Sequence, residues 1–380
     1  MADDDRSLFN LPADRAYFNC AAVGPLPRAA QEAIAAAAAR HGQPWLIDHG
    51  DWIDAVEERR ALFAALAGTD AEAIALVPSV SYGLAVAARN LHAEPGQCVL
   101  VPADDFPSGV YTWRAFAART GCEIRTVSRT GDQSWTDAVL AAIDERVAIV
   151  AMPNVHWTDG GLFDLVAIGA RARDVGAKLA VDSSQSLGVL PLDLAKVRPD
   201  FLACVGYKWL LGPYGLSYLY VAPEHRGGQP IEENWLMREG AEDFARLVDY
   251  QEAYLPGARR FDCGQRSAFE LTRAASVGLR LMVHWRASRI SRQLGEVTGW
   301  IEAEALKLGF AATSGPQRGP HLLGLALPAG KADRARAVFA EAKVDVAFRG
   351  ASVRIAPHMY TIDEDVERLI GALERIASGS

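Results

Sequence analysis

The sequence predicts an α/β protein: a mostly parallel sheet of seven strands with helices on both faces, followed by a smaller α+β unit. Short apolar or β-branched runs alternate with helical patterns of ten or more residues from about residue 70 to residue 221. This alternation is typical of βαβ units, whose strands lie parallel in one sheet. The 380 residues, 50% of them hydrophobic, suffice for a large buried core.

Seven strands and four intervening helices make up the predicted sheet layer. The strands are 73–77, 97–102, 122–128, 147–152, 178–182, 200–204 and 216–221, and the helices are 81–91, 108–120, 135–145 and 164–176. Only about a dozen residues separate the last two strands, which is too few for a parallel crossover with its own helix. We therefore expect the last strand to run antiparallel.

Helices also precede and follow this sheet. The sequence predicts helices at 29–40 and 52–67, a less regular stretch at 222–265, and a long helical run from Glu270 to Leu308. A strand, a helix at 332–342, strands at 344–348 and 352–355, and a helix at 363–376 complete the chain. The predicted organisation is a large domain at 20–270 and a small one at 271–380, with an N-terminal arm, 1–19, packed against the small domain.

Composition excludes several classes of protein. A formal charge of −8 without a basic run argues against nucleic acid or an anionic membrane as partner. Five scattered cysteines form no CxxC pair, so we predict free thiols in a reducing compartment and no metal site. The acidic start lacks a following hydrophobic stretch, and no apolar run is long enough to span a membrane. These features together predict a cytoplasmic protein.

Lys208 is the most informative residue of the chain. It follows the apolar strand at 200–204, and the turn Gly212–Gly215 leads directly into the next strand. Lysine is almost never fully buried without a partner, and partial burial lowers its pKa and frees the amine for covalent chemistry. A lysine that extends its charge from a strand end into water remains an equally good interpretation of this segment alone.

Other polar or aromatic residues follow the ends of the predicted strands, where ligands bind in sheets of this kind. Each has an ordinary structural alternative: a serine that caps a helix, a histidine inside a core. Together they supply an amine, a carboxylate, an anion cradle at a helix N-terminus and a stacking ring. They are Ser79, Ser81, Phe106, Asn154, His156, Asp182 and Lys208.

This set meets the needs of pyridoxal 5'-phosphate, whose aldehyde, pyridine nitrogen and phosphate require a lysine, a carboxylate and an anion site. Asp182, Gln185 and the segment Gly206–Trp209, in this order and spacing, resemble the cofactor signature of the class V aminotransferase family. That family includes cysteine desulfurases, kynureninases and isopenicillin N epimerase-like enzymes, and the resemblance extends from Tyr17 to the region of Arg354. It implies the PLP-dependent transferase fold type I.

The resemblance implies a role for each matching residue. Lys208 would form the Schiff base, Asp182 would pair with the pyridine nitrogen, and Phe106 would stack on the ring. The remaining implied contacts are Gln185 and Asn154 with the ring hydroxyl, Ser79, Val80, Ser81 and Tyr207 with the phosphate, and Arg354 with the substrate carboxylate. His156 is a further candidate for substrate binding.

The resemblance also implies a homodimer with a shared active site. Gln265 occupies the place from which the partner usually contributes to the phosphate site, although the family commonly has threonine there. The predicted partners are therefore a small amino acid or amine and a second copy of the chain. Neither nucleic acid nor a membrane is expected.

Several reactions remain open. Transamination is favoured because it needs nothing beyond these residues, while a β-cleaving lyase (a C–S lyase or a kynureninase-like enzyme) and an epimerase are alternatives. Persulfide-forming desulfuration is disfavoured, because no cysteine follows Cys263. Three other classes are disfavoured because the sequence lacks the feature that each requires. A PLP-binding sensor would need a DNA-binding head. A dehydrogenase would need a GxGxxG motif after a strand, and a serine hydrolase would need a GxSxG motif.

Overall fold

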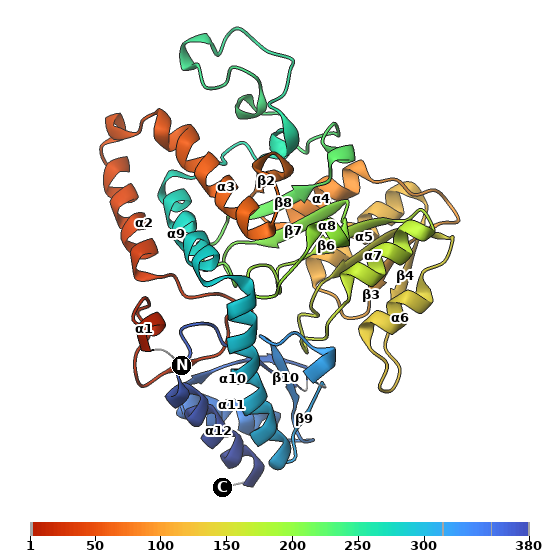
Figure 1. Cartoon of the computed structure of the whole chain (residues 1–380), viewed down its shortest axis with the longest axis vertical. Coiled ribbons are helices and arrows are strands. Elements are labelled where there is room, and N and C mark those ends of the chain that lie inside the picture. The colour runs from red at the N-terminus through yellow and green to blue at the C-terminus, as the bar shows by residue number, and fades with distance from the viewer. Residues whose placement is uncertain (1–2, 314, 351, 379–380) are drawn as a thin grey trace.

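The computed structural model describes residues 3–313, 315–350 and 352–378. A large layer of strands and helices occupies one half of the molecule, and a smaller sheet with its own helices lies below it in the view of Figure 1. Residues 1–2, 314, 351 and 379–380, which belong to the predicted arm and small domain, lie outside the described residues.

The large sheet has the seven strands that the sequence predicts. In spatial order they are β2 (Ile74–Val77), β8 (Ser217–Val221), β7 (Phe201–Val205), β6 (Lys178–Asp182), β5 (Val147–Pro153), β3 (Cys98–Pro102) and β4 (Glu123–Val127). The predicted antiparallel last strand is confirmed, because β8 runs antiparallel to both β7 and β2. The other neighbouring strands are parallel.

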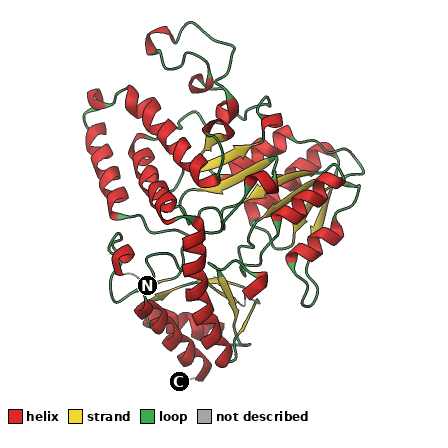
Figure 2. Cartoon of the chain, viewed as in Figure 1, coloured by secondary structure: helices red, strands yellow, loops and turns green. Residues whose placement is uncertain are grey.

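Helices cover both faces of this sheet (Figure 2). Along β2, Ile74 and Leu76 pack into one hydrophobic cluster while Ala75 and Val77 pack into another. Burial of alternate residues on opposite faces explains why β2 appears in the sequence as a continuous apolar run. The helices are α4 (Val80–Asn90), α5 (Pro107–Thr120), α6 (Trp135–Ala142), α7 (Leu165–Asp174) and the short α8 (Leu194–Val197).

The predicted continuous helix from Glu270 to Leu308 is wrong. The chain forms α9 (Phe269–Trp285) and α10 (Ala287–Lys307), separated by Arg286 with a φ of 65°. Helix α9 packs beside α2 (Arg28–His41) and α3 (Ala55–Ala67), whereas α10 continues down to the smaller sheet (Figure 1). The chain bends between α9 and α10 because the two helices bury their apolar faces against different partners. No glycine or proline at the bend indicates it in the sequence.

The C-terminal unit is a four-stranded antiparallel sheet with two helices. Its strands, in spatial order, are β12 (Ala347–Arg349), β13 (Ser352–Ile355), β10 (Leu323–Ala326) and β9 (Ala311–Ala312), and its helices are α11 (Ala332–Glu341) and α12 (Asp363–Ser378). The predicted strand at 344–348 is two short strands, β11 (Val344–Asp345) and β12.

The N-terminal segment contacts this C-terminal unit. After the short helix α1 (Asp3–Arg6), strand β1 (Ala16–Tyr17) pairs in parallel with β11. Ala16 and Phe18 are buried in the hydrophobic cluster of the C-terminal unit. The division into an arm, a large domain and a small domain, with its boundary at residues 270–271, remains a prediction.

Two features of composition can be compared with the structure. Within the described part of the chain no helix combines the length and apolar character needed to cross a bilayer. All five cysteines are free, and four of them, Cys20, Cys98, Cys122 and Cys204, are buried.

Candidate active site

A cavity of about 240 Å³ lies where the strands of the large sheet end, and Lys208 is part of its wall. Eight of the predicted site residues line this cavity: Ser79, Val80, Ser81, Phe106, Asp182, Gln185, Tyr207 and Lys208. Four others, Asn154, His156, Gln265 and Arg354, do not line it. A larger cleft of about 560 Å³ lies under residues 233–252 and contains none of the predicted site residues.

Lys208 is buried, with 7% of its surface exposed. Its Nζ lies 5.4 Å from the centre of the Phe106 ring and 5.8 Å from that of Tyr207. Burial lowers the pKa of Lys208 to about 8, although the Asp182 carboxylate favours the charged form. A substantial fraction of the amine is therefore neutral near physiological pH, as covalent chemistry at Nζ requires.

The backbone of Lys208 is held by the N-terminal segment and by Gln185. The Gly24 N–H donates to the Tyr207 carbonyl at 2.8 Å, and a Cβ at Gly24 would lie 2.1 Å from the Lys208 carbonyl oxygen. Gln185 accepts from Trp209 Nε1 at 2.9 Å and donates to the Ala21 carbonyl at 3.1 Å. The Lys208 segment is thus tied to a part of the chain almost two hundred residues away.

We expect Gly24→Ala to displace the Lys208 segment, because the methyl group has no room beside the Lys208 carbonyl. The expected loss is about 1–3 kcal/mol in the free energy of unfolding, together with roughly tenfold weaker cofactor binding. Urea unfolding and cofactor titration measure the two effects. Gly227→Ala is the control, because no atom of the described residues lies within 4 Å of a Cβ at Gly227. Equal behaviour of the two variants would contradict the expectation.

The N-terminus of α4 provides an anion site on one wall of the cavity. Ser79 is its N-cap: the Oγ atom accepts from the Tyr82 N–H at 3.1 Å and lies 2.8 Å from the Ser81 Oγ. The first N–H groups of a helix have no partner within the helix, and its dipole favours negative charge there. The N–H of Val80 and the two hydroxyl groups therefore form a suitable cradle for a phosphate.

Two carboxylates stand at the cavity, one of which the sequence analysis missed. Asp182, at the end of β6, accepts the Ser184 N–H at 2.9 Å. Asp105 also lines the cavity and accepts the Phe106 N–H at 2.7 Å. Burial, and secondarily the Asp182 charge, raise the pKa of Asp105 to about 7. The signal in the sequence was the acidic residue directly before the predicted stacking ring.

Asp105 should make the stability of the apoenzyme depend on pH. Its pKa is 3.8 ordinarily and about 7 when folded, so between these values only the folded state keeps the proton. The free energy of unfolding should then fall as pH rises from about 4 to 7, and the loss is complete above 7. We expect Asp105→Asn to match the wild type closely at pH 4 and to be more stable by about 4 kcal/mol at pH 8, because each unit of pKa shift corresponds to about 1.4 kcal/mol.

Urea unfolding of the apoenzyme at both pH values measures this difference. The control is Asp132→Asn in an exposed loop, which should not alter the pH profile. A variant of Asp105 that retained the wild-type profile would show that this carboxyl group does not titrate as described.

Asn154 and His156 follow β5 as predicted but are engaged within the protein. Asn154 Nδ2 donates to the Phe163 carbonyl at 3.1 Å, while its buried Oδ1 has no partner among the described residues. His156 is buried, its nitrogens contact Thr158 Oγ1 at 2.7 Å and the Ala103 carbonyl at 3.0 Å, and its ring stacks on Trp135. The structure therefore does not bring the predicted substrate-binding His156 to the cavity.

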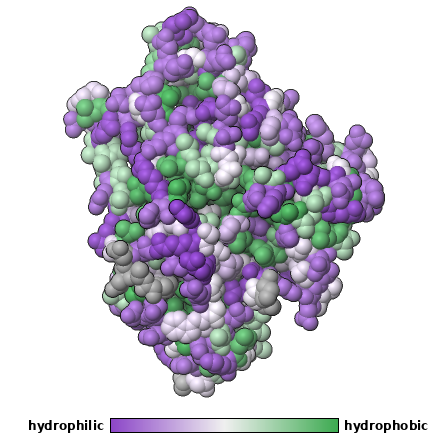
Figure 3. Space-filling model, viewed as in Figure 1, coloured by the Kyte–Doolittle hydropathy of each residue, from purple (hydrophilic) through white to green (hydrophobic). Residues whose placement is uncertain are grey.

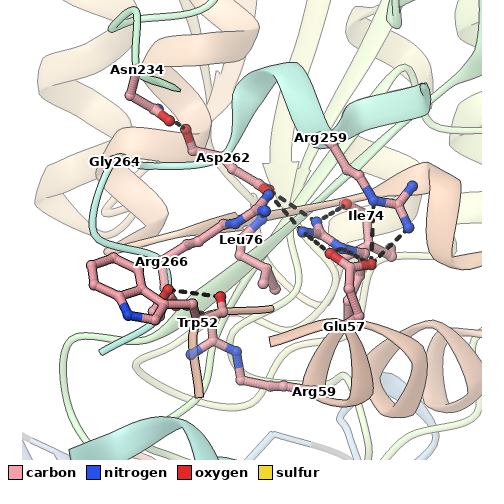
Figure 4. A network of polar contacts seen from close by, with 12 residues as sticks. Trp52, Glu57, Arg59, Ile74, Leu76, Asn234, Arg259, Asp262, Gly264 and Arg266 are labelled. Atoms are coloured by element: carbon pink, nitrogen blue, oxygen red, sulfur yellow. Dashed lines mark hydrogen bonds and ion pairs between the residues drawn. The ribbon is translucent and has the colours of Figure 1, made fainter. Parts of the chain in front are cut away.

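Gln265 is exposed and lies outside the cavity of its own chain. The segment that carries it is anchored by Asp262, which is fully buried (Figure 4). Asp262 accepts from the two terminal nitrogens of Arg60 at 2.9 and 2.7 Å, from the Leu76 N–H at 2.7 Å, and from Arg266. This network holds Gln265 close to the end of β2 while leaving its side chain open to solvent.

Arg354 lies on β13 and is 1% exposed. Its Nη1 donates to the Trp157 carbonyl at 2.8 Å, and its Nε and Nη2 have no partner among the described residues. Burial lowers the pKa of Arg354 to about 9, and Arg349 contributes to the decrease. Trp157 lines the cavity, so Arg354 stands directly behind its wall with two donor groups free.

The residues of the cavity fit pyridoxal 5'-phosphate. They offer a buried amine of lowered pKa, a carboxylate at a strand end, an aromatic face and an anion cradle at a helix N-terminus. The free acceptor of Asn154 and the free donors of Arg354 are buried polar atoms of the kind that ligands satisfy. The arrangement defines a PLP enzyme of fold type I.

Comparison with known proteins identifies the family. The family model of Aminotransferase class-V matches residues 48–369. An uncharacterised aminotransferase of Bacillus subtilis, YcbU, is 30% identical over 333 residues, which cover 84% of each chain. Isopenicillin N epimerase of Streptomyces clavuligerus is 26% identical over 94% of each chain, and kynureninase of Geobacillus thermodenitrificans is 25% identical over 98% of this chain and 90% of its own.

Solved structures show the same fold. A mutant of C-DES with glycine covalently linked to its PLP cofactor superimposes with a TM-score of 0.86 at 22% identity and covers 97% of this chain and 98% of its own. The chain belongs to the class V aminotransferase family. It is a PLP-dependent enzyme whose cofactor is pyridoxal 5'-phosphate.

Proposed function

We propose that this enzyme transfers the amino group of an amino acid to a keto acid. The observation that carries the proposal is the position of Lys208: of the described residues that line the cavity, it is the only amine, and its pKa is about 8. Transamination needs one base that removes a proton from the substrate Cα and returns it to a neighbouring carbon on the same side. A single lysine of this pKa meets that requirement.

Pyridoxal 5'-phosphate supplies the electron sink when it is bound. In this proposal Asp182 holds a proton on the pyridine nitrogen, Phe106 covers the ring, and the cradle of Ser79, Val80 and Ser81 binds the phosphate with the help of Tyr207. Gln185 and Asn154 contact the ring hydroxyl. Gln185 retains a free N–H and Asn154 a free carbonyl oxygen for these contacts.

The substrate carboxylate is assigned to Arg354. A guanidinium binds a carboxylate through two parallel hydrogen bonds, and Arg354 has two nitrogens without partners among the described residues. This contact would fix the amino acid with its Cα beside Lys208 Nζ. Orientation of this kind is a large part of the rate that an enzyme gains.

A homodimer completes the proposed site. Gln265 is exposed on a rigid segment, and Tyr214 lines the cavity while 75% of its surface is exposed. Hydrophobic residues gather across the middle of the face shown in Figure 3, and Trp45 is 77% exposed. Contact with a second copy would cover such apolar surface and bring Gln265 to the partner's phosphate site.

The test is to add single amino acids to the purified holoenzyme without any keto acid. Transamination predicts that each enzyme molecule takes up one amino group and then stops, so the absorbance of the cofactor changes stoichiometrically and one equivalent of keto acid is formed. Addition of a second keto acid should restore the original spectrum. Continued release of ammonia, pyruvate or alanine without a keto acid would overturn the proposal.

A β-cleaving lyase is the second candidate, and Tyr207 is the observation that favours it. Tyr207 lines the cavity 5.8 Å from Lys208 Nζ, and burial raises the pKa of its phenol. A phenol that keeps its proton can donate it to a leaving group at Cβ. The same experiment separates the two reactions, because cleavage at Cβ is catalytic without a keto acid.

A further inference from the structure

Arg349 is a second guanidinium beside the wall of the Lys208 cavity. It lies at the end of β12, in the hairpin that leads into β13 and Arg354. Its guanidinium carbon is 5.1 Å from the centre of the Trp157 ring, the same residue whose carbonyl accepts from Arg354. The Trp157 ring in turn contacts Phe106 edge to face at 5.4 Å. Both arginines therefore converge on one side of the cavity.

Neither arginine forms an ion pair within the described part of the chain. Arg349 Nη1 donates to the Phe348 carbonyl at 2.8 Å, and its buried Nε has no partner there. The buried Arg60 and Arg318, by contrast, pair with Asp262 and Glu302. A partly buried cation without a counter-charge is unfavourable in the free protein, so its presence beside a cavity indicates an anionic ligand.

The charges of the site leave one cation without a ligand. Arg354 is assigned to the substrate α-carboxylate, and the helix N-terminus at Ser79 to the phosphate. Asp182 serves the pyridine nitrogen, and Asp105 keeps its proton up to about pH 7. Both arginines disfavour the charged form of Lys208, so their positive potential reaches the amine. An amino acid with a neutral side chain would leave Arg349 unsatisfied.

We propose that the substrate is an amino acid with a second anionic group, a carboxylate, on a short side chain. Arg354 binds the α-carboxylate and Arg349 binds the side-chain anion, with Trp157 between them. The cavity of about 240 Å³ must also hold the cofactor, so it leaves room only for a short side chain. The assignment of the two ends rests on the proposed function, which places the amino group at Lys208. Binding of two anions does not depend on amino transfer.

The first measurement compares succinate with butyrate by calorimetry on the holoenzyme. The two ligands have the same chain length and lack an amino group, but only succinate is a dianion at neutral pH. We expect succinate to bind about 10- to 100-fold more tightly, because the second carboxylate gains a charge-assisted hydrogen bond. Equal affinity for the two ligands would overturn the proposal.

The second measurement repeats the comparison with Arg349→Gln. We expect this variant to lose the preference for succinate while its affinity for butyrate stays within about twofold, and Arg349→Lys to retain part of the preference. Arg336→Gln is the matched control: Arg336 also stacks on an aromatic ring, 4.0 Å from the centre of Phe348, but is exposed on α11. Equal weakening of both ligands by Arg349→Gln would assign Arg349 to a structural role and contradict the proposal.

These results are independent of the proposed reaction. An enzyme that prefers succinate but does not transaminate any amino acid would retain the anion site and lose the proposed function. An enzyme that transaminates neutral amino acids and shows no preference for succinate would retain the function and lose this inference. The cofactor absorbance and the melting temperature of each variant verify that it is folded and loaded.

Discussion

Lys208→Ala is expected to abolish the covalent attachment of pyridoxal 5'-phosphate and to reduce turnover by about a thousandfold or more. The reason is that one side chain supplies both the amine that carries the cofactor and the base that moves the substrate proton. Its burial and its pKa of about 8 suit both tasks. Reduction with borohydride followed by mass spectrometry should find the cofactor on residue 208 of the wild type and on no residue of the variant.

Two further variants test whether the loss of attachment and turnover is specific to the amine of Lys208. Lys196→Ala removes a lysine whose side chain is 70% exposed and should leave attachment and turnover unchanged. Lys208→Arg keeps the positive charge but cannot form the covalent link, so it should fail in the same way as alanine. Attachment of the cofactor to Lys208→Ala, or turnover within tenfold of the wild type, would contradict the assignment of Lys208.

The large sheet could be predicted because most of its strands are buried on both faces and therefore appear as apolar runs of their own length. Strand β4 is the exception: it is mostly exposed or half-buried, and its β-branched residues indicated the strand. The break at Arg286 could not, because it arises from the different partners of α9 and α10 and not from a local residue preference. A bend of this kind is set by packing between segments that are distant in sequence. The spacing of apolar residues within α9 and α10 would be the same in a continuous helix and in a broken one.

The site residues also include some that could be predicted from the sequence and others that could not. Lys208, Asp182 and Phe106 follow strand ends, and the position of a strand end is local information. The sequence did not predict roles for Asp105, Asp262 and Arg349, because a sequence does not show whether a carboxylate or guanidinium is buried or paired. Each interacts with a residue far along the chain: Asp105 with the charge of Asp182, Asp262 with Arg60, and Arg349 with the ring of Trp157. His156 shows the opposite case, in which a residue at a strand end is engaged in packing.

Arg354→Ala is expected to reduce kcat/KM for amino acids by about 100- to 1000-fold, because the α-carboxylate loses a paired guanidinium contact. The amine that corresponds to the substrate without its carboxylate is the matched probe, and its slow turnover should be unchanged by the variant. Arg292→Ala, at an exposed position on α10, controls for the loss of a charge. An equal loss with the amine would show that Arg354 acts on the fold and not on the carboxylate.

The stability of a second variant, Arg354→Met, offers an independent test of the role of Arg354. An arginine that holds a structural ion pair destabilises the protein when it is removed, because its buried partner loses its counter-charge. Arg354 has no acidic partner among the described residues, and burial lowers its pKa to about 9. In the absence of substrate its charge is a cost to the folded state. Arg354→Met, which removes the charge and keeps most of the buried volume, should therefore lose substrate binding while its free energy of unfolding in urea stays close to or above the wild-type value, a combination that an arginine in a structural ion pair would not produce.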